Sequence, residues 1–268
     1  MKAIFDKNKI DLELFDPGYN NRAFQYGDGM FETILCRNRQ IQLLDDHLAR
    51  IRDGCKMLSL VLPDYFSRKY IEDKTRELIR ENKLSGTVRI KVLIWRKTGG
   101  LYEPKYREMH HLILADPFKE KIPRNLRRVA FCKTIVNYPS PWSAFKTQSS
   151  LPYVLAGIEK EENDLEDIIL TDMYGNVSEL LYSNIFWIRN NTFFTPSLKT
   201  GCIRGVMRTH LIRKLKELNI PSREVMEGKS VLLEADHVFS ANITGLIAVT
   251  GVESHRFQKY ADLTQLLP

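Results

Sequence analysis

The spacing of apolar and polar residues predicts alternating strands and helices in the first half of the chain. Residues 29–37 (GMFETILCR) and 39–44 (RQIQLL) are typical of two strands joined by a short polar turn. Residues 45–60 start with two aspartates and continue with apolar residues at helical spacing, which predicts a helix. We expect a second helix within residues 65–83, followed by strands over residues 87–96 and 109–116.

The pattern breaks where Pro117 and Pro123 flank a charged stretch. Prolines and charges of this kind are typical of a connection between domains. The sequence therefore predicts a small N-terminal α/β domain (residues 1–116), a linker (117–123) and a larger C-terminal domain (124–268), an α+β architecture.

The second half of the chain again alternates between strands and helices. A helix over residues 149–163 carries Leu151, Val154, Leu155 and Ile158 on one stripe. The other expected elements are strands over 127–136 and 165–172, a hairpin over 184–196, a helix over 205–219, short strands over 237–254 and a terminal helix.

The composition of the chain excludes few classes of function. The 268 residues carry a net charge of +7, which favours a small anionic partner, but the basic residues are scattered and form no recognisable nucleic-acid module. No signal peptide and no apolar run of about 20 residues is present, so we expect a cytoplasmic protein without membrane partners.

Cysteines and histidines indicate neither disulfides nor a metal site. The four cysteines are far apart, so we expect reduced, buried thiols. His110 and His111 are adjacent in a predicted strand and would point to opposite faces, which excludes easy sharing of one metal ion.

Four features could bear chemistry, although each has an ordinary structural explanation. Lys146 stands among aromatic and hydroxyl residues, Glu179 lies in an apolar setting, and Arg50 lies in the first predicted helix. Gly201 and Gly205 lead into a helix whose first N–H groups could bind an anion. Together they supply what pyridoxal phosphate requires, namely a Schiff-base lysine, an acid for the pyridinium nitrogen and donors for the phosphate.

Five segments occur in an order that indicates a family. They are RAFQYGDGMFETI (22–34), HLARI (47–51), FKTQSSLPYVLA (145–156), DMYGNVSELLYSNIFWI (172–188) and GCIRGVMR (201–208). On these segments the chain resembles the class IV, or fold-type IV, aminotransferase family of pyridoxal-phosphate enzymes over nearly its whole length. The resemblance implies the two-domain fold of D-amino acid aminotransferase type and a homodimer with active sites near the interface.

The resemblance also implies roles for individual residues. Lys146 would form the Schiff base, and Glu179 would contact the ring nitrogen. The phosphate would be bound by Arg50, by the backbone N–H groups of Val206 and Met207, and by Asn242 with the backbone of Ile243.

Within this family the activities to consider are 4-amino-4-deoxychorismate lyase and the branched-chain and D-amino acid aminotransferases. The GDGMFET signature, the short chain and the methionine in GVMR favour the lyase. The candidates for substrate binding are Tyr26, Arg96, Lys97 and Tyr102. A non-catalytic basic binding domain is the remaining alternative, and the presence of the lysine, glutamate and arginine together argues against it.

Overall fold

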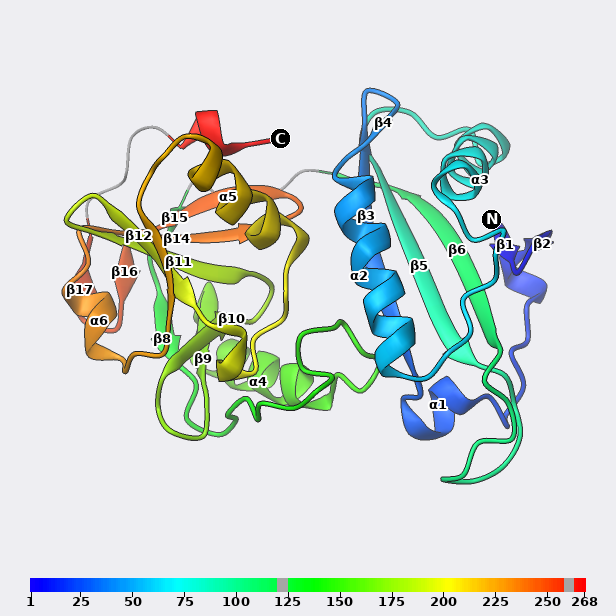
Figure 1. Cartoon of the computed structure of the whole chain (residues 1–268), viewed down its shortest axis with the longest axis horizontal. Helices are drawn as coiled ribbons and strands as arrows, with labels where there is room; N and C mark the ends of the chain where they lie inside the picture. The colour runs from blue at the N-terminus through cyan, green and yellow to red at the C-terminus, as the bar shows by residue number, and fades with distance from the viewer. Residues whose placement is uncertain (120–124, 258–262) are drawn as a thin grey trace. The chain divides into compact units, whose positions relative to one another are not determined.

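The computed structural model describes residues 1–119, 125–257 and 263–268, and the chain divides into two units (Figure 1). Unit 1 comprises Met1–Glu120 with Phe145–Ser149, and unit 2 comprises Lys121–Ala144 with Ser150–Pro268. The expected linker falls partly on residues 120–123, which lie outside the described residues. The limits 1–116 and 124–268 stay predictions.

Unit 1 is built on a six-stranded sheet with the strand order β2-β1-β6-β5-β3-β4, in which every neighbouring pair is antiparallel. Its strands are β1 (Lys2–Phe5), β2 (Asn8–Asp11), β3 (Gly29–Arg37), β4 (Gln40–Ile41), β5 (Val88–Arg96) and β6 (Met109–Pro117). Its helices are the short 3-10 helix η1 (Leu12–Leu14), α1 (Arg22–Tyr26), α2 (Leu44–Met57) and α3 (Arg68–Glu81).

The core of unit 1 confirms the predicted helical periodicity. Leu48, Ile51 and Cys55 of α2 are buried in one cluster with Ile71 of α3 and Ile90 of β5. The second helix begins at Arg68, three residues inside the predicted range, because the side chain of Ser67 accepts a hydrogen bond from the Tyr70 backbone N–H at 3.3 Å.

Residues 145–149 pack with unit 1, which differs from the expectation that the whole of 124–268 forms one domain. The Phe31 backbone N–H donates to the carbonyl of Lys146 at 2.8 Å, and the Gln148 N–H donates to the carbonyl of Gly29 at 2.9 Å. These bonds extend the edge of β3 by a short antiparallel bridge between Met30 and Thr147. Backbone pairing distant in sequence therefore assigns Lys146 to unit 1.

Unit 2 contains two sheets, ordered β10-β9-β8-β16-β17 and β13-β12-β11-β14-β15-β7. The strands are β7 (Asn125–Leu126), β8 (Val129–Phe131), β9 (Asp167–Thr171), β10 (Val177–Leu180), β11 (Asn184–Arg189), β12 (Thr192–Pro196), β13 (Ser222–Val225), β14 (His237–Asn242), β15 (Gly245–Val249), β16 (Gly251–Val252) and β17 (His255–Arg256). The helices are α4 (Leu151–Glu162), η2 (Leu198–Thr200), α5 (Val206–Glu217), α6 (Ser230–Leu233) and η3 (Thr264–Leu266).

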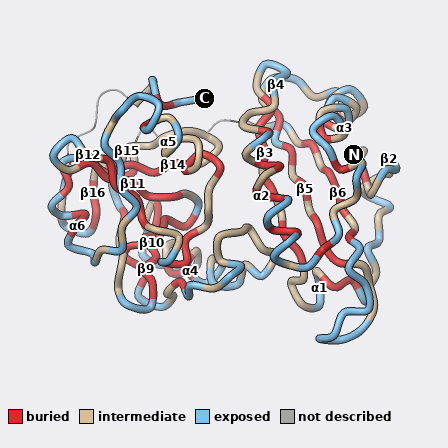
Figure 2. The backbone as a smooth tube through the Cα atoms, in the orientation of Figure 1, coloured by how far each residue is buried: buried red, intermediate tan, exposed pale blue. Residues whose placement is uncertain are grey.

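Both sheets contribute to one buried cluster of unit 2. Ile169 of β9 and Val177 of β10 share it with Trp187 of β11 and Val238 of β14. Figure 2 shows the corresponding pattern, with buried backbone concentrated in the strands and exposed backbone in the loops. The predicted hairpin and the helix at 205–219 are confirmed, whereas the strand expected over 127–136 is only three residues long. The expected terminal helix falls largely on residues 258–262, outside the described residues.

Helix α4 has the predicted apolar stripe, but the stripe is exposed. Leu151, Val154, Leu155 and Ile158 are between 41% and 65% exposed. The buried side of α4 instead presents Ala156 and the carboxylate of Glu159. That carboxylate accepts bonds from the backbone N–H groups of residues 133 and 134 at 2.8 and 3.0 Å. Helical spacing predicted the stripe correctly but could not predict which side of α4 faces the core.

The cysteines and histidines lie as expected, with all four thiols buried. His111 is fully buried and His110 is partly exposed. Residues 1–119, 125–257 and 263–268 hold no cluster of three or more His, Cys, Asp or Glu side chains able to bind a metal ion. None of the helices in these ranges has the length and apolar character that crossing a membrane requires.

Candidate active site

Glu179 is a buried carboxylate surrounded by hydrogen-bond donors of unit 2. It is 3% exposed, on strand β10. Oε1 accepts from the hydroxyl of Tyr153 at 2.7 Å and from the side-chain amide of Asn137 at 3.1 Å, and Oε2 accepts from the backbone N–H of Ile203 at 3.1 Å. Such donors favour the ionised carboxylate in a buried setting. Glu179 is therefore not an ordinary exposed carboxylate at the end of a strand.

The turn containing Ile203, whose backbone N–H donates to Glu179, leads directly into helix α5. Gly205 is the N-cap of this helix, so the backbone N–H groups of Val206 and Met207 belong to its first turn. A Cβ atom on residue 205 would lie 2.0 Å from Oδ1 of Asn184, whose Nδ2 donates to the carbonyl of Ile203 at 2.8 Å. A larger residue here would require Asn184 or the turn to move, and the helix start offers donors and a positive dipole end to an anion.

Asn242 stabilises a second turn of unit 2, at the end of strand β14. Its Oδ1 accepts from the backbone N–H of Thr244 at 2.8 Å and from the Thr244 hydroxyl at 2.6 Å. Its Nδ2 donates to the carbonyl of Tyr182 at 3.2 Å. The Asn242 side chain thus fixes the backbone around Ile243, which is half-buried.

Lys146 is half-buried in unit 1, beside strand β3. Its Nζ lies 5.1 Å from the centre of the Phe31 ring, and its carbonyl is the acceptor for the Phe31 N–H. A lysine held against an aromatic ring and fixed by backbone pairing does not have the setting of a fully solvated surface cation.

Arg50 is buried in unit 1 as part of an ion-pair cluster with Glu32 and His47. Its Nε donates to Glu32 Oε1 and its Nη2 donates to Oε2, both at 2.6 Å, while Nδ1 of His47 lies 2.7 Å from Oε2. Burial raises the pKa of Glu32, but the charge of Arg50 and the hydrogen bonds from His47 and Arg50 outweigh it and lower this pKa to about 2. Glu32 thus orients the guanidinium through two parallel bonds.

Arg96, one of the substrate-binding candidates, has structural partners on all three guanidinium nitrogens. Its Nε donates to Asp28 at 2.9 Å, Nη1 donates to the carbonyls of Ser59 and Tyr106, and Nη2 donates to the carbonyl of Leu58 at 2.5 Å. These contacts give Arg96, which is 5% exposed, a role in holding unit 1 together.

The other three substrate-binding candidates lie at the surface of unit 1. The rings of Tyr26 and Tyr102 are 5.8 Å apart, and Tyr102 is 92% exposed. Lys97 is half-buried after β5. The guanidinium of Arg22 lies 4.8 Å from the Tyr26 ring and donates to the carbonyls of Gly99, Gly100 and Leu101, so it ties the loop bearing Tyr102 to α1.

Comparison with known proteins identifies the family. The family model for amino-transferase class IV matches residues 29–252. The chain belongs to this family. Class IV aminotransferases are pyridoxal-phosphate enzymes, and the expected family, its cofactor and its two-domain fold are confirmed.

Relatives of this class IV aminotransferase have more than one activity. An aminodeoxychorismate lyase of Vibrio harveyi is 24% identical over 241 residues, which cover 87% of this chain and 86% of that protein. A branched-chain-amino-acid aminotransferase of Salmonella typhimurium is 26% identical over 248 residues, which cover 87% of this chain and 80% of that protein.

Solved structures show the same fold for both activities. The branched-chain aminotransferase of Thermoproteus uzoniensis superposes with a TM-score of 0.88 at 22% identity, covering 97% of this chain and 90% of that one. The 4-amino-4-deoxychorismate lyase of Pseudomonas aeruginosa superposes with a TM-score of 0.84 at 24% identity, covering 99% of this chain and 96% of that one.

Several residues around the candidate site are absent from the sequence prediction. Glu32 and His47 lie inside the quoted family segments, but only the fold shows that Glu32 contacts both His47 and Arg50. Tyr153 and Asn137 contact Glu179 from 26 and 42 residues away in sequence. The sequence offers a sign of only one of these four residues, Tyr153, because its hydroxyl stands within the apolar run LPYVLA.

Proposed function

We propose that this member of the class IV aminotransferase family acts as a 4-amino-4-deoxychorismate lyase. Such an enzyme releases pyruvate and forms 4-aminobenzoate, a folate precursor. The observation that carries the choice of the lyase is Met207, the second residue of helix α5, which is 1% exposed. Transaminases of the family usually have threonine here, so Met207 leaves a phosphate-binding turn with backbone donors and no hydroxyl. The similarity to the Vibrio harveyi lyase over most of both chains supports the same choice.

The residues present fit the cofactor. Lys146 would hold pyridoxal phosphate covalently, and the carboxylate of Glu179 would accept a hydrogen bond from the protonated ring nitrogen. The N–H groups of Val206 and Met207, after a glycine packed closely against Asn184, would bind the phosphate. When bound, the cofactor supplies an electron sink for the carbanion formed at the substrate carbon.

Arg50 and Asn242 would complete the phosphate site. Glu32 accepts hydrogen bonds from Nε and Nη2 of Arg50 and so orients the guanidinium, whose positive charge would contribute to the phosphate site. Asn242 fixes the turn whose Ile243 backbone would provide a further donor.

Lys146 would also move the proton. Once the substrate amine has displaced it, the ε-amine is the base that removes the proton from the carbon bearing nitrogen. The C–O bond between the substrate ring and the enolpyruvyl group then breaks, and this group leaves as pyruvate. The substrate ring becomes aromatic, and no keto-acid acceptor is needed. Tyr26, Lys97 and Tyr102 stay our candidates for contacting the substrate carboxylates, whereas the contacts of Arg96 support a structural role.

A dianionic substrate agrees with the net charge of +7.

We also propose a homodimer in the cytoplasm. The four exposed apolar side chains of α4 support a subunit interface, because a stripe of this kind is unusual on the surface of a monomer. Sedimentation of the purified protein at about twice the mass of the 31.2 kDa chain is the expected result.

The test uses purified protein with added pyridoxal phosphate. Incubation with aminodeoxychorismate alone is expected to release pyruvate and 4-aminobenzoate in equal amounts. The Lys146→Ala variant should lose this turnover, and Lys216→Ala, which removes an exposed lysine of α5, should keep it.

A transaminase is the second candidate, favoured by the 26% identity to the Salmonella typhimurium enzyme. Branched-chain L-amino acids and D-alanine are therefore each incubated with 2-oxoglutarate. Glutamate formation that depends on the acceptor, with no pyruvate from aminodeoxychorismate alone, would replace the lyase proposal by this one.

A further inference from the structure

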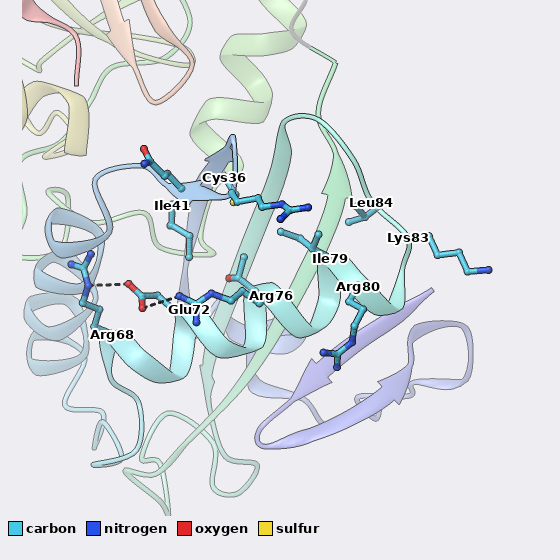
Figure 3. Close-up of a pocket in the computed structure, with 12 residues that line it drawn as sticks. Cys36, Ile41, Arg68, Glu72, Arg76, Ile79, Arg80, Lys83 and Leu84 are labelled. Carbon is cyan, nitrogen blue, oxygen red and sulfur yellow. Dashed lines mark hydrogen bonds and ion pairs between the residues drawn. The ribbon is translucent and has the colours of Figure 1, made fainter.

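Unit 1 contains a pocket of about 1090 Å³ that none of the proposed catalytic residues lines (Figure 3). Its walls come from one side of helix α3 and from the β3–β4 hairpin. Residues 68, 72, 75, 76, 79 and 80 of α3 line it, and this spacing of three and four residues forms one helix face. The volume is sufficient for a nucleotide-sized ligand.

The wall of the pocket is apolar with polar groups interspersed. Ile41, Ile79 and Leu84 contribute half-buried apolar surface. Thr75 also lines the pocket, and its hydroxyl, which is buried, has no hydrogen-bond partner among the residues that the structure describes. Because this oxygen is buried, a ligand in the pocket cannot contact it without a rearrangement. The exposed amide of Gln40 offers further donors and acceptors.

The rim is strongly cationic, but three of its arginines already have acidic partners. Figure 3 shows Glu72 between Arg68 and Arg76, at 3.0 and 3.5 Å. Arg80 lies 3.6 Å from Glu81. These pairs offset most of the charge on this part of the rim.

Arg39 and Lys83 also line the pocket, but unlike these three arginines they have no acidic partner. This holds within ion-pair distance among residues 1–119, 125–257 and 263–268. Both are exposed and line the pocket, Arg39 from the hairpin turn and Lys83 from just after α3. Figure 3 shows the Lys83 side chain extended away from the pocket, so it must turn to contact an anion there. Their long side chains can turn over a bound anion.

The backbone at both residues supports a specific role. Arg39 has φ +63° at the second position of the two-residue β3–β4 turn, and Lys83 has φ +52° just after the C-cap Asn82 of α3. Glycine or asparagine is favoured at such positions, because a side chain disfavours the left-handed region. Among the described non-glycine residues with positive φ, these two are the basic ones, and both line this pocket.

We propose that this pocket is a second ligand site, and that it binds a small anion with a ring system and two or more negative charges, the chemistry of a nucleoside di- or triphosphate. Arg39 and Lys83 bind the phosphates, the apolar wall packs against the ring system, and the exposed amide of Gln40 hydrogen-bonds its polar edge. The site is separate from the proposed catalytic residues and does not rest on the proposed reaction.

Calorimetric titration of the protein with ADP tests the proposal. The protein is first saturated with pyridoxal phosphate and then freed of excess cofactor, so that ADP does not bind at the phosphate turn of α5 and no free cofactor competes for the pocket. We expect saturable binding with a Kd below about 1 mM that weakens as salt is added. Adenosine, which lacks the charge, and pyrophosphate, which lacks the ring, should each bind at least roughly tenfold more weakly.

Matched glycine variants separate charge from backbone effects. Arg39→Gly and Lys83→Gly remove the cations at positions where glycine is favoured, and each should raise the Kd for ADP roughly tenfold without lowering the melting temperature. Asn38→Gly in the same turn and Asn219→Gly just after α5 change left-handed positions without removing charge, and they should leave the Kd unchanged. Arg39→Gln and Lys83→Gln repeat the test if a glycine variant fails to fold.

Three results would overturn the proposal. They are no saturable ADP binding up to about 10 mM, equal affinity of wild type and the charge-removing variants, and pyrophosphate binding as tightly as ADP, which would indicate an adventitious anion only.

Discussion

The hydroxyl of Tyr153, on helix α4, donates a hydrogen bond to Oε1 of Glu179, on strand β10, over 2.7 Å. Burial raises the pKa of Tyr153, and the charge of Glu179 raises it further, so the phenol stays protonated and remains a donor. With Asn137 on the same oxygen, Tyr153 fixes the direction in which the buried carboxylate points. We therefore regard Tyr153 as a positioning residue for Glu179.

Replacing Tyr153 by Phe should impair the proposed reaction while preserving the fold. The variant removes one donor to a buried charged group, which costs about 1.5–3 kcal/mol. We expect kcat to fall about tenfold or more, with a smaller change in KM. The visible spectrum of the bound cofactor should also shift, which a loss of packing alone would not cause. Tyr174→Phe, at a residue 74% exposed, serves as control, and a Tyr153→Phe enzyme with unchanged kcat and spectrum would contradict the positioning role.

The Glu179→Gln variant should lose most of the activity. The amide is nearly isosteric but cannot keep a ring nitrogen protonated, so we expect kcat to fall by about 10²–10⁴. The measurement is kcat with saturating cofactor, alongside thermal unfolding. Glu161→Gln, at an exposed position of α4, should retain full activity. If Glu179→Gln turned over at the wild-type rate, the carboxylate would have no role in the chemistry.

The acid stability of the protein should depend on Glu32. Its pKa falls from 4.5 to about 2 in the fold, so its stabilising contribution is fully present above about pH 4.5 and is lost as the pH falls toward 2. The contribution is roughly 3 kcal/mol. In Glu32→Gln the free energy of unfolding should depend less steeply on pH between 5 and 2 than in the wild type.

Glu32→Gln also removes the carboxylate that is ion-paired with Arg50, a guanidinium that is only 3% exposed. We expect a loss of about 3–5 kcal/mol of stability near pH 7, measured by urea unfolding, and weaker cofactor binding. Glu161→Gln again provides the control. Parallel pH profiles of wild type and Glu32→Gln would show that the ion pair contributes nothing to acid stability.

Gly205→Ala should disrupt the start of helix α5. The added Cβ would lie 2.0 Å from Oδ1 of Asn184, so the turn or Asn184 must move. We expect at least roughly tenfold weaker binding of pyridoxal phosphate, measured by fluorescence titration. Gly157→Ala in α4 is the matched control, because its Cβ would lie 3.7 Å from Leu181, an ordinary contact. It should bind the cofactor normally and be slightly more stable, since alanine favours a helix.

The sequence predicted much of the local structure and the family. Helices over α2, α3 and α5 and the β11–β12 hairpin follow from periodicity and turn residues, which act over a few neighbouring positions. The order of the five family segments identified the chain as a class IV aminotransferase before any fold was known, and its family model then matched residues 29–252. The same segments predict Lys146, Glu179 and Arg50 as cofactor-binding residues.

The tertiary structure decided which groups these residues contact. It placed Glu32 against Arg50 and Tyr153 against Glu179, occupied the donors of Arg96 with structural partners, and turned the apolar stripe of α4 away from the core. The physical reason is range. Periodicity and turn chemistry depend on nearby residues, whereas the contacts of Glu32 with Arg50, Tyr153 with Glu179 and Asp28 with Arg96 join residues 18 to 68 positions apart. Such contacts form only once strands and helices have packed, so the sequence determined the elements and the family, and the fold determined the partners.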